Sequence, residues 1–403
     1  MKRSVVFIYN SFKDPLFQGN LFQQLLLESK NCRFKFHLIT FEQKEYQLSA
    51  EEEVATKRKL RTKNIFWTPL KWHSGRFIIL KKLYDLINSL LLIVKIHIKH
   101  KPSSIISLGT IAGGYCYIIK SIFFYKHYAY QFEPHSEFMA DFNIWNKTSI
   151  KYKVLNKLEA LTSKNAEIIS TGTHYMKDRL HNMKVAADIF YLPSCINEEY
   201  FPLSAKKRIE IRDRYNIASN QKVLIYLGKF GGIYYDKEIF NLMEEIYLSI
   251  NDIFIFILTP NNHLAINAEL RNRKINNFHV TKAEYRSVYE FLNAADVGIS
   301  AIPGFPSQKY RSPIKIGEYL LCGLPYITCS GVSEDDIIAE KYHCGVVLEN
   351  YERSEIKNSM NQIKALFSHQ DKSRLREIGI SYRGLSMHSI TVKNIFKKLN
   401  KIS

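Results

Sequence analysis

The stretch from residue 309 to residue 331 constrains the fold more than any other part of the chain. Ser312 and Pro313 form a helix start signal, because serine caps free backbone N–H groups and proline is tolerated in the first turn. Gly323 is a typical helix stop, and the apolar run Tyr326–Cys329 resembles a buried strand. The stretch therefore predicts a helix of about ten residues that leads directly into a buried strand.

Apolar runs of strand length recur along the whole chain, separated by segments with helical periodicity. The predicted strands lie at residues 5–9, 34–40, 65–67, 105–108, 128–132, 166–171, 222–227, 254–258, 278–280, 297–301 and 326–329. This alternation predicts an α/β fold with doubly wound parallel sheets. A length of 403 residues fits two domains of ordinary size.

Lys315 and Glu318 lie three residues apart in the predicted helix, so their side chains share one face. The positive dipole end of a helix favours a phosphate, and Lys315 would add a point charge. The Glu318 carboxylate can accept hydrogen bonds from ribose hydroxyls. This pattern suits a nucleotide, but a capped surface helix with no ligand stays open on the residues alone.

The segments SPIKIGEYLLCGLPYI and GVSEDDIIAEKYHCGVVLEN resemble the donor-site segment of nucleotide-sugar glycosyltransferases of family four, which have the GT-B fold. The resemblance implies two Rossmann-like domains that face a cleft. It assigns the diphosphate to the helix start at Ser312, Pro313 and Lys315, and the ribose to Glu318. Many members carry a glutamate near the donor sugar where this chain has Tyr310, so whether the departure alters or abolishes activity stays open.

A glycine-rich turn at residues 228–232 follows one of the predicted strands. Gly228 and Gly231 would let the backbone approach a diphosphate, and Lys229 would neutralise it. The turn matches neither the P-loop pattern nor the GxGxxG pattern. The family uses a basic residue in this loop, and the resemblance assigns that role to Lys229.

Gly19 and Gly109 are predicted to lie in loops on the acceptor side. DPLFQGN, which ends just after Gly19, resembles the first loop of the family, although a plain turn explains this glycine equally well. Gly109 follows a predicted strand, and Gly113 and Gly114 precede an apolar helix. Such an arrangement would let a ligand approach backbone N–H groups.

His135 and Glu133 are the predicted catalytic residues. The segment EPHSEFMADFNIWNKTSIKYKVLNKLE resembles a subset of family-four enzymes, in which a histidine near this position lies in the cleft beside the reacting sugar. Glu133, His135 and Glu137 are three titratable groups at the end of a predicted strand, where active sites of α/β folds occur. The alternative from the residues alone is a helix start capped by Ser136.

The resemblance also predicts the domain boundaries. Residues 1–196 would form the acceptor-side domain, because YLPSCINEEYFP resembles the end of the first domain in the family. Residues 197–385 would form the donor domain, and residues 386–403 a terminal helix that packs back on the first domain.

The cysteines and histidines indicate no metal site. Their spacing contains neither C-x-x-C nor H-x-x-x-H, so we expect no metal and no cofactor besides the nucleotide-sugar substrate. No secretory signal precedes the first strand, and a reducing cytoplasm is the expected location. The six cysteines are Cys32, Cys116, Cys195, Cys322, Cys329 and Cys344.

The formal net charge is +19, and residues 1–195 carry +14 of it, from 29 Lys and Arg against 15 Asp and Glu. Such a field attracts anionic lipid, nucleic acid or phosphorylated substrates. Residues 76–100 predict one long helix, whose apolar run at 89–94 is far shorter than the ~20 residues that span a bilayer. It would lie on an anionic membrane surface or be a mostly buried crossover helix, and the buried helix is favoured.

These observations predict a cytoplasmic glycosyltransferase, peripheral at the inner face of a membrane, that moves a hexosyl-type sugar from a nucleoside diphosphate. Its acceptor would be a glycan or lipid-linked precursor of a capsule or cell-surface polysaccharide, and nucleic acid is not an expected partner. The resemblance implies retention of configuration, and metal would be dispensable. A nucleotide-sugar epimerase of the same fold and a non-catalytic partner subunit stay open as alternatives.

Overall fold

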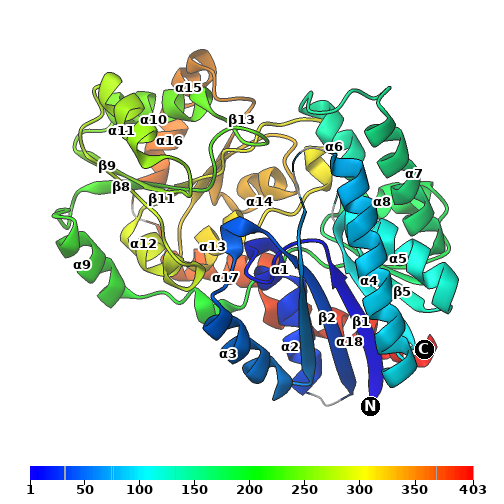
Figure 1. The fold of residues 1–403 in the computed structure, drawn as a ribbon. Coiled ribbons are helices and arrows are strands. Elements are labelled where there is room, and N and C mark those ends of the chain that lie inside the picture. The colour runs from blue at the N-terminus through cyan, green and yellow to red at the C-terminus, as the bar shows by residue number, and fades with distance from the viewer. Residues whose placement is uncertain (31–32, 74, 76, 132, 369, 403) are drawn as a thin grey trace. The chain divides into compact units, whose positions relative to one another are not determined.

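The computed structural model describes residues 1–30, 33–73, 75, 77–131, 133–368 and 370–402 (Figure 1). Cys32, Arg76 and Phe132, which the sequence-based predictions include, lie outside the described residues. The chain forms two compact units. Unit 1 comprises Met1–Ser194 with His388–Ser403, and unit 2 comprises Cys195–Met387.

Unit 1 is built on a sheet in which every strand pair is parallel. The strand order is β3-β2-β1-β4-β5-β6-β7. The strands are β1 (Lys2–Ile8), β2 (Phe34–Glu42), β3 (Ile65–Lys71), β4 (Ser104–Leu108), β5 (Lys126–Tyr130), β6 (Ile168–Thr171) and β7 (Asp188–Tyr191). Most of these residues are apolar and buried, because helices cover both faces of a parallel sheet.

The helices of unit 1 connect successive strands. They are α1 (Pro15–Gly19), α2 (Leu21–Lys30), α3 (Ala50–Arg61), α4 (Ile78–His100), α5 (Gly109–Phe123), α6 (His135–Asp141), α7 (Ile150–Asn165) and α8 (His174–Asn182). α18 (Leu385–Ile402) contributes its later turns to the same unit. There Phe396 is buried, with its ring 5.4 Å from that of Phe34 and 5.9 Å from that of Phe36.

Unit 2 contains a second sheet, also parallel throughout, with the order β10-β9-β8-β11-β12-β13. Its strands are β8 (Lys222–Leu227), β9 (Ile253–Leu258), β10 (Phe278–Thr281), β11 (Val297–Ile299), β12 (Tyr326–Cys329) and β13 (Gly345–Leu348). Its helices are α9 (Ala205–Arg214), α10 (Lys237–Ser249), α11 (His263–Asn272), α12 (Val288–Ala294), α13 (Lys315–Leu321), α14 (Asp335–Tyr342), α15 (Arg353–Asn358), α16 (Met360–Leu366) and α17 (Lys372–Arg383). The predicted α/β class with doubly wound parallel sheets is thus confirmed.

The glycine pair Gly113 and Gly114 lies inside α5 and not ahead of a helix, so that prediction is wrong. A Cβ on Gly113 would lie 3.0 Å from Thr162 Cγ2, and one on Gly114 would lie 3.2 Å from Leu158 Cδ1. The two glycines therefore let α5 pack closely against α7, which leaves no room for a ligand at their backbone.

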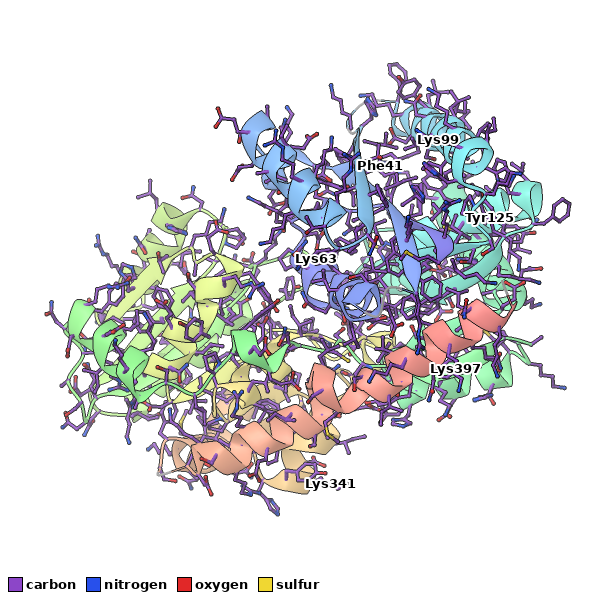
Figure 2. All side chains as sticks on the ribbon, turned by 90° about the horizontal axis from the view of Figure 1, so that it is seen from below. Phe41, Lys63, Lys99, Tyr125, Lys341 and Lys397 are labelled. Atoms are coloured by element: carbon purple, nitrogen blue, oxygen red, sulfur yellow. The ribbon has the colours of Figure 1, made fainter. Side chains whose placement is uncertain are left out.

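The net charge is almost entirely on unit 1. This unit has 33 Lys and Arg against 15 Asp and Glu, a balance of +18, whereas unit 2 has 24 against 23, a balance of +1. Figure 2 labels Lys63, Lys99 and Lys397, three of the lysines of unit 1. Within the described part of the chain, no helix combines the length and the apolar character that a membrane crossing requires.

Candidate functional site

The sheet of unit 2 has a switch point between β8 and β11. From β8 the chain moves outward to β9 and β10, and it later returns to the other side of β8 as β11. In such sheets the connections beyond the carboxyl ends of the two central strands diverge and leave a ligand site. The segment after β8 meets the segment after β11, because the Tyr235 N–H donates to the Ala301 carbonyl at 3.0 Å.

Lys315, the first residue of α13, reaches back to this switch point. Its Nζ is buried and hydrogen-bonds to none of the described residues. The Nζ lies 4.4 Å from the centre of the Tyr234 ring and 5.7 Å from that of Tyr226. Burial lowers the pKa of Lys315, while Tyr234 and Glu318 act against this shift. The ammonium group of Lys315 could therefore donate hydrogen bonds to an anion bound at this point.

Three cationic side chains act electrostatically on the Tyr234 hydroxyl. Lys315 is the main cause that lowers the pKa of Tyr234, and Arg311 and Lys229 add to this effect. Burial acts in the opposite direction, so the local positive potential outweighs desolvation. The same potential would stabilise the negative charge of a bound phosphate.

The glycine turn after β8 approaches Lys315 closely. Gly228 has φ +143°, and a Cβ at this position would overlap Lys315 Nζ. The Tyr226 hydroxyl donates to the Lys229 carbonyl at 2.5 Å, which fixes the turn from within. Gly231 has φ +73°, a conformation that glycine adopts without strain. The predicted turn residue Gly228 thus lies against Lys315, and Lys229 and Gly231 follow it in the same turn.

Glu318 lies one turn beyond Lys315 on α13 and is only 4% exposed. Its carboxylate is hydrogen-bonded to the Tyr285 hydroxyl. Burial raises the pKa of Glu318 to about 7, whereas Lys315 and the Tyr285 hydrogen bond act to lower it. The alternative of a capped surface helix, in which Glu318 would be exposed, is therefore wrong for this residue.

The predicted helix cap at Ser312 is wrong. α13 begins at Lys315, with Ile314 at the cap position and no side-chain cap hydrogen bond, and it has seven residues. Pro313 accordingly precedes the helix. Ser312 Oγ instead accepts a hydrogen bond from Arg383 Nη1. The predicted stop is correct, because Gly323 has φ +68° and the Leu324 N–H returns to the Tyr319 carbonyl at 2.9 Å.

Arg383 connects the segment before α13 to the start of α14. It is fully buried, and its Nη2 donates to Asp335 Oδ1 at 3.0 Å and to the Tyr382 hydroxyl at 2.7 Å. Burial raises the pKa of Asp335 to about 6, although Arg383 acts to lower it. A second contact runs from Arg383 Nη2 to Ser333 Oγ at 3.3 Å. Removal of this guanidinium would leave a buried carboxylate without its cation.

In unit 1, His135 and Glu133 contact each other, since His135 Nδ1 lies 2.9 Å from Glu133 Oε1. Glu137 points elsewhere and pairs with Arg179, whose Nη1 lies 3.0 Å from Glu137 Oε2. The alternative of a Ser136 cap is wrong, because Pro134 holds the cap position of α6 and the Ser136 hydroxyl donates to Glu159. His135 therefore has a carboxylate that can orient its ring.

The two predicted acceptor-side glycines follow neighbouring strands of unit 1. Gly19 is buried and ends α1, so it lies in a short helix and not in an open loop. Gly109 begins α5 with φ +77° directly after β4. Because β1 and β4 flank the switch point of this sheet, both segments start at its ligand-binding edge.

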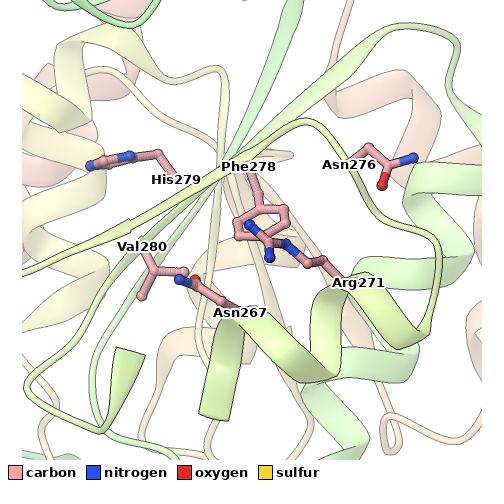
Figure 3. A pocket seen from close by; sticks show the side chains of 6 residues that line it. All are labelled: Asn267, Arg271, Asn276, Phe278, His279 and Val280. Atoms are coloured by element: carbon pink, nitrogen blue, oxygen red, sulfur yellow. The ribbon is translucent and has the colours of Figure 1, made fainter. Parts of the chain in front are cut away.

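A separate cavity of about 310 Å³ lies in unit 2 between α11 and β10 (Figure 3). Burial lowers the pKa of His279 at its wall. None of the predicted site residues lines it; the lining residues are Asn267, Arg271, Asn276, Phe278, His279 and Val280.

Sequence reasoning missed four residues of the unit 2 site: Tyr234, Arg311, Tyr285 and Arg383. Arg311 carried a usable signal, because it is a second cation four residues before Lys315. Tyr234 lies just after the glycine-rich turn, Tyr285 and Arg383 come from distant segments, and none of the three carries a local pattern. Among the described residues, no group of three or more His, Cys, Asp and Glu side chains is arranged to hold a metal ion.

The fold matches solved GT-B glycosyltransferase structures over the full length of the chain. Sucrose-phosphate synthase from Thermosynechococcus elongatus aligns with a TM-score of 0.72 at 12% identity, covering 100% of both chains. A glycosyltransferase from Rickettsia africae aligns with a TM-score of 0.71 at 13% identity, also covering 100% of both. The Anabaena protein HepE in complex with UDP-glucose aligns with a TM-score of 0.69 at 12% identity, covering 99% of each chain.

By sequence, the chain matches no protein-family model and no curated protein. The similarity to known proteins is therefore a similarity of fold. At such low sequence identity most side chains differ.

Proposed function

We propose that the chain is a glycosyltransferase of the family-four type that binds a nucleoside-diphosphate-sugar at the switch point of unit 2. The observation that carries this proposal is the buried Lys315 ammonium group, which has no hydrogen-bond partner among the described residues. Burial of an unpaired ammonium group is unfavourable, and a diphosphate supplies both the countercharge and the acceptors.

The donor contacts follow from the surrounding residues. Lys315, Arg311 and Lys229 would neutralise the diphosphate beside Gly228 and Gly231, and Glu318 would accept hydrogen bonds from the ribose hydroxyls. UDP is the first nucleotide to test, because structural neighbours are described as complexes with UDP and UDP-glucose.

The proposed reaction transfers a hexosyl group with retention. The bond between the anomeric carbon and the leaving phosphate oxygen breaks, and a bond from that carbon to the acceptor oxygen forms on the same face. The acceptor proton passes to an oxygen of the departing diphosphate. The cationic side chains would stabilise the charge that develops there, which is the reason to propose that no metal ion is needed.

The proposed acceptor is a glycan or lipid-linked precursor of a capsule or cell-surface polysaccharide. His135, oriented by Glu133, would contact the donor sugar or the acceptor in the transfer step. A lipid-linked acceptor would hold the enzyme at the inner face of the membrane, in the cytoplasm where nucleotide sugars are made.

Calorimetric titration with UDP, followed by incubation with UDP-sugars and membrane extracts as acceptor, tests this function. We expect UDP binding in wild type, weaker UDP binding by Lys315→Met, and sugar transfer that requires acceptor. Conversion of the donor sugar without acceptor would identify an epimerase instead. Binding without transfer or donor hydrolysis would identify a non-catalytic subunit, and no binding of any nucleoside diphosphate would reject the site.

A further inference from the structure

α4 presents an exposed apolar face along its whole length, contrary to the buried helix that the sequence favoured. Six large apolar side chains on this face are between 47% and 72% exposed. These residues, which we term the α4 apolar face, are Leu80, Leu83, Tyr84, Ile87, Leu91 and Ile98. At 1.5 Å per residue they extend over about 27 Å of helix, and their spacing places them on one side.

The opposite side of α4 is anchored in unit 1. Ile93 is fully buried in the core beside the sheet. Asp85 is 1% exposed and accepts a hydrogen bond from the Tyr9 hydroxyl at 2.8 Å. Asp85 also lies 2.5 Å from His73 Nδ1. The helix is therefore held with a fixed side inward, and exposure of the apolar face does not result from a loosely attached helix.

Positively charged side chains lie along one edge of the α4 apolar face. Lys95 and Lys99 are exposed and follow the same helical edge, and Lys101 is exposed just beyond the helix (Figure 2 labels Lys99). The helix contains a single acidic residue, Asp85, and that residue is buried. The outer side of α4 therefore combines apolar and cationic side chains and presents no carboxylate.

Two exposed phenylalanines near the two ends of α4 have unfavourable backbone conformations. Phe77, at the start of α4, is 65% exposed with φ +62°, and Phe124, at the end of α5, is 88% exposed with φ +57°. The rings of Phe123 and Tyr125 both lie beside His97 of α4, which brings Phe124 to the later turns of this helix. Positive φ is costly for a bulky side chain, and at the C-terminal end of a helix, where Phe124 lies, glycine is the usual residue in this conformation.

We propose that the α4 apolar face, together with Phe77, Phe124 and the lysines at its edge, is a docking surface for an anionic lipid bilayer. Apolar side chains would enter the boundary between headgroups and acyl chains, and Lys95 and Lys99 would contact anionic headgroups. The helix would lie along the bilayer surface.

Charge complementarity favours a bilayer over a second copy of the chain. Unit 1 carries a net charge of +18, so two such faces brought together would repel each other through the same lysines. An anionic surface offers the opposite sign over an area large enough for the whole helix.

Co-sedimentation of the full chain with vesicles tests the proposal without nucleotide, and therefore independently of the donor site. We expect binding to vesicles of phosphatidylglycerol and phosphatidylcholine, weaker binding at high salt, and little binding to phosphatidylcholine alone. The triple variant Leu80→Ser, Leu91→Ser, Phe124→Ser and the double variant Lys95→Gln, Lys99→Gln should each reduce the partition coefficient about tenfold or more.

Matched controls alter similar side chains elsewhere. Leu248→Ser with Leu264→Ser removes two exposed apolar residues of unit 2, and Lys59→Gln with Lys63→Gln removes two exposed lysines of unit 1. Both controls should bind within about twofold of wild type. Wild-type binding by the α4 variants, or no vesicle binding by wild type, would overturn the proposal. A wild-type dimer in light scattering that the triple variant dissociates would overturn it in favour of a second copy.

Discussion

The Lys315 ammonium nitrogen lies 4.4 Å from the centre of the Tyr234 ring and is buried without a hydrogen bond to any residue that the structure describes. A tyrosine ring attracts a cation, but it does not replace the hydrogen bonds that water supplies. Burial of the Lys315 ammonium group is therefore unfavourable for folding, and the proposed function requires positive charge at this point.

The first prediction concerns Lys315→Met, which keeps the apolar stem and removes the charge. Because the buried charge is unpaired, the variant should be more stable than wild type by about 1 to 3 kcal/mol in thermal or urea unfolding. Affinity for UDP should fall by about 1.5 to 3 kcal/mol, since a charged hydrogen bond to phosphate is lost. Lys341→Met is the control, because Lys341 also lies beside a tyrosine, 5.1 Å from the Tyr342 ring, but is exposed. Equal effects of both substitutions would contradict the proposed role.

The second prediction concerns pH and Glu318. Because its pKa in the folded chain is about 7 and its ordinary value is 4.5, the folded state binds more protons between these values. The free energy of unfolding should therefore decrease as pH rises from 4.5 to 7, by about 3 kcal/mol from this group alone. Glu318→Gln should lack this contribution, which the difference between wild-type and variant urea unfolding measures at each pH.

The Glu318 carboxylate should also make nucleotide binding depend on pH. UDP affinity should rise with pH, whereas the free energy of unfolding falls. Ionised Glu318 accepts ribose hydroxyl hydrogen bonds, so the UDP affinity of wild type should rise between pH 6 and pH 8, around its pKa of about 7. Glu318→Gln should show a flatter profile and weaker binding at pH 8, by about 1 to 3 kcal/mol. Parallel profiles for the two proteins would remove Glu318 from the ribose contact.

The third prediction compares two glycines of the turn after β8. Gly228→Ala should destabilise the fold and weaken UDP binding about tenfold or more, because the new Cβ would displace Lys315 Nζ. Gly232→Ala also places an alanine at a positive φ, +68°, where the backbone cost is smaller than at φ +143°, and nothing lies within 4 Å of the new Cβ. Calorimetric titration of both variants separates the two effects, and equal losses of UDP affinity would argue against the contact with Lys315.

The fourth prediction is that His135→Ala reduces turnover about a hundredfold or more while UDP affinity stays unchanged. Glu133→Gln should reduce turnover less, because it alters only the partner of the histidine. Turnover per folded molecule is measured together with the melting temperature of the same sample. A variant with a lower melting temperature and wild-type turnover would assign His135 a structural role.

The fifth prediction is that a chelator leaves sugar transfer unchanged, because Lys315, Arg311 and Lys229 supply the positive charge at the proposed diphosphate position. The measurement is turnover before and after dialysis against EDTA. Loss of activity that magnesium restores would show that these side chains are insufficient.

Much of the fold was predictable because buried parallel strands are continuous apolar runs. β8 and β12 have the predicted bounds, and the other predicted strands differ by a few residues. β7 and β13 were missed, and both lie at sheet edges, where short half-buried strands lack a clear apolar pattern. β3 extends beyond its prediction through Pro69, because an edge strand tolerates a missing N–H.

The candidate site was predictable only where its residues are close in sequence. The shared face of Lys315 and Glu318 followed from helical spacing and is present. The cap at Ser312 was wrong because Arg383, 71 residues further along, binds its hydroxyl. The exposure of α4 was not predictable either, since a helix with apolar residues on nearly all sides over much of its length is usually buried.

The later turns of α18 place Phe396 beside Phe34 and Phe36, and this has a consequence for synthesis on the ribosome. The core of unit 1 requires residues that are translated only after all of Cys195–Met387. At about 5 to 20 residues per second, roughly 10 to 40 s separate the two parts of that core. Unit 2 can therefore complete its sheet first, while Phe34 and Phe36 of the nascent first half lack their contact with Phe396.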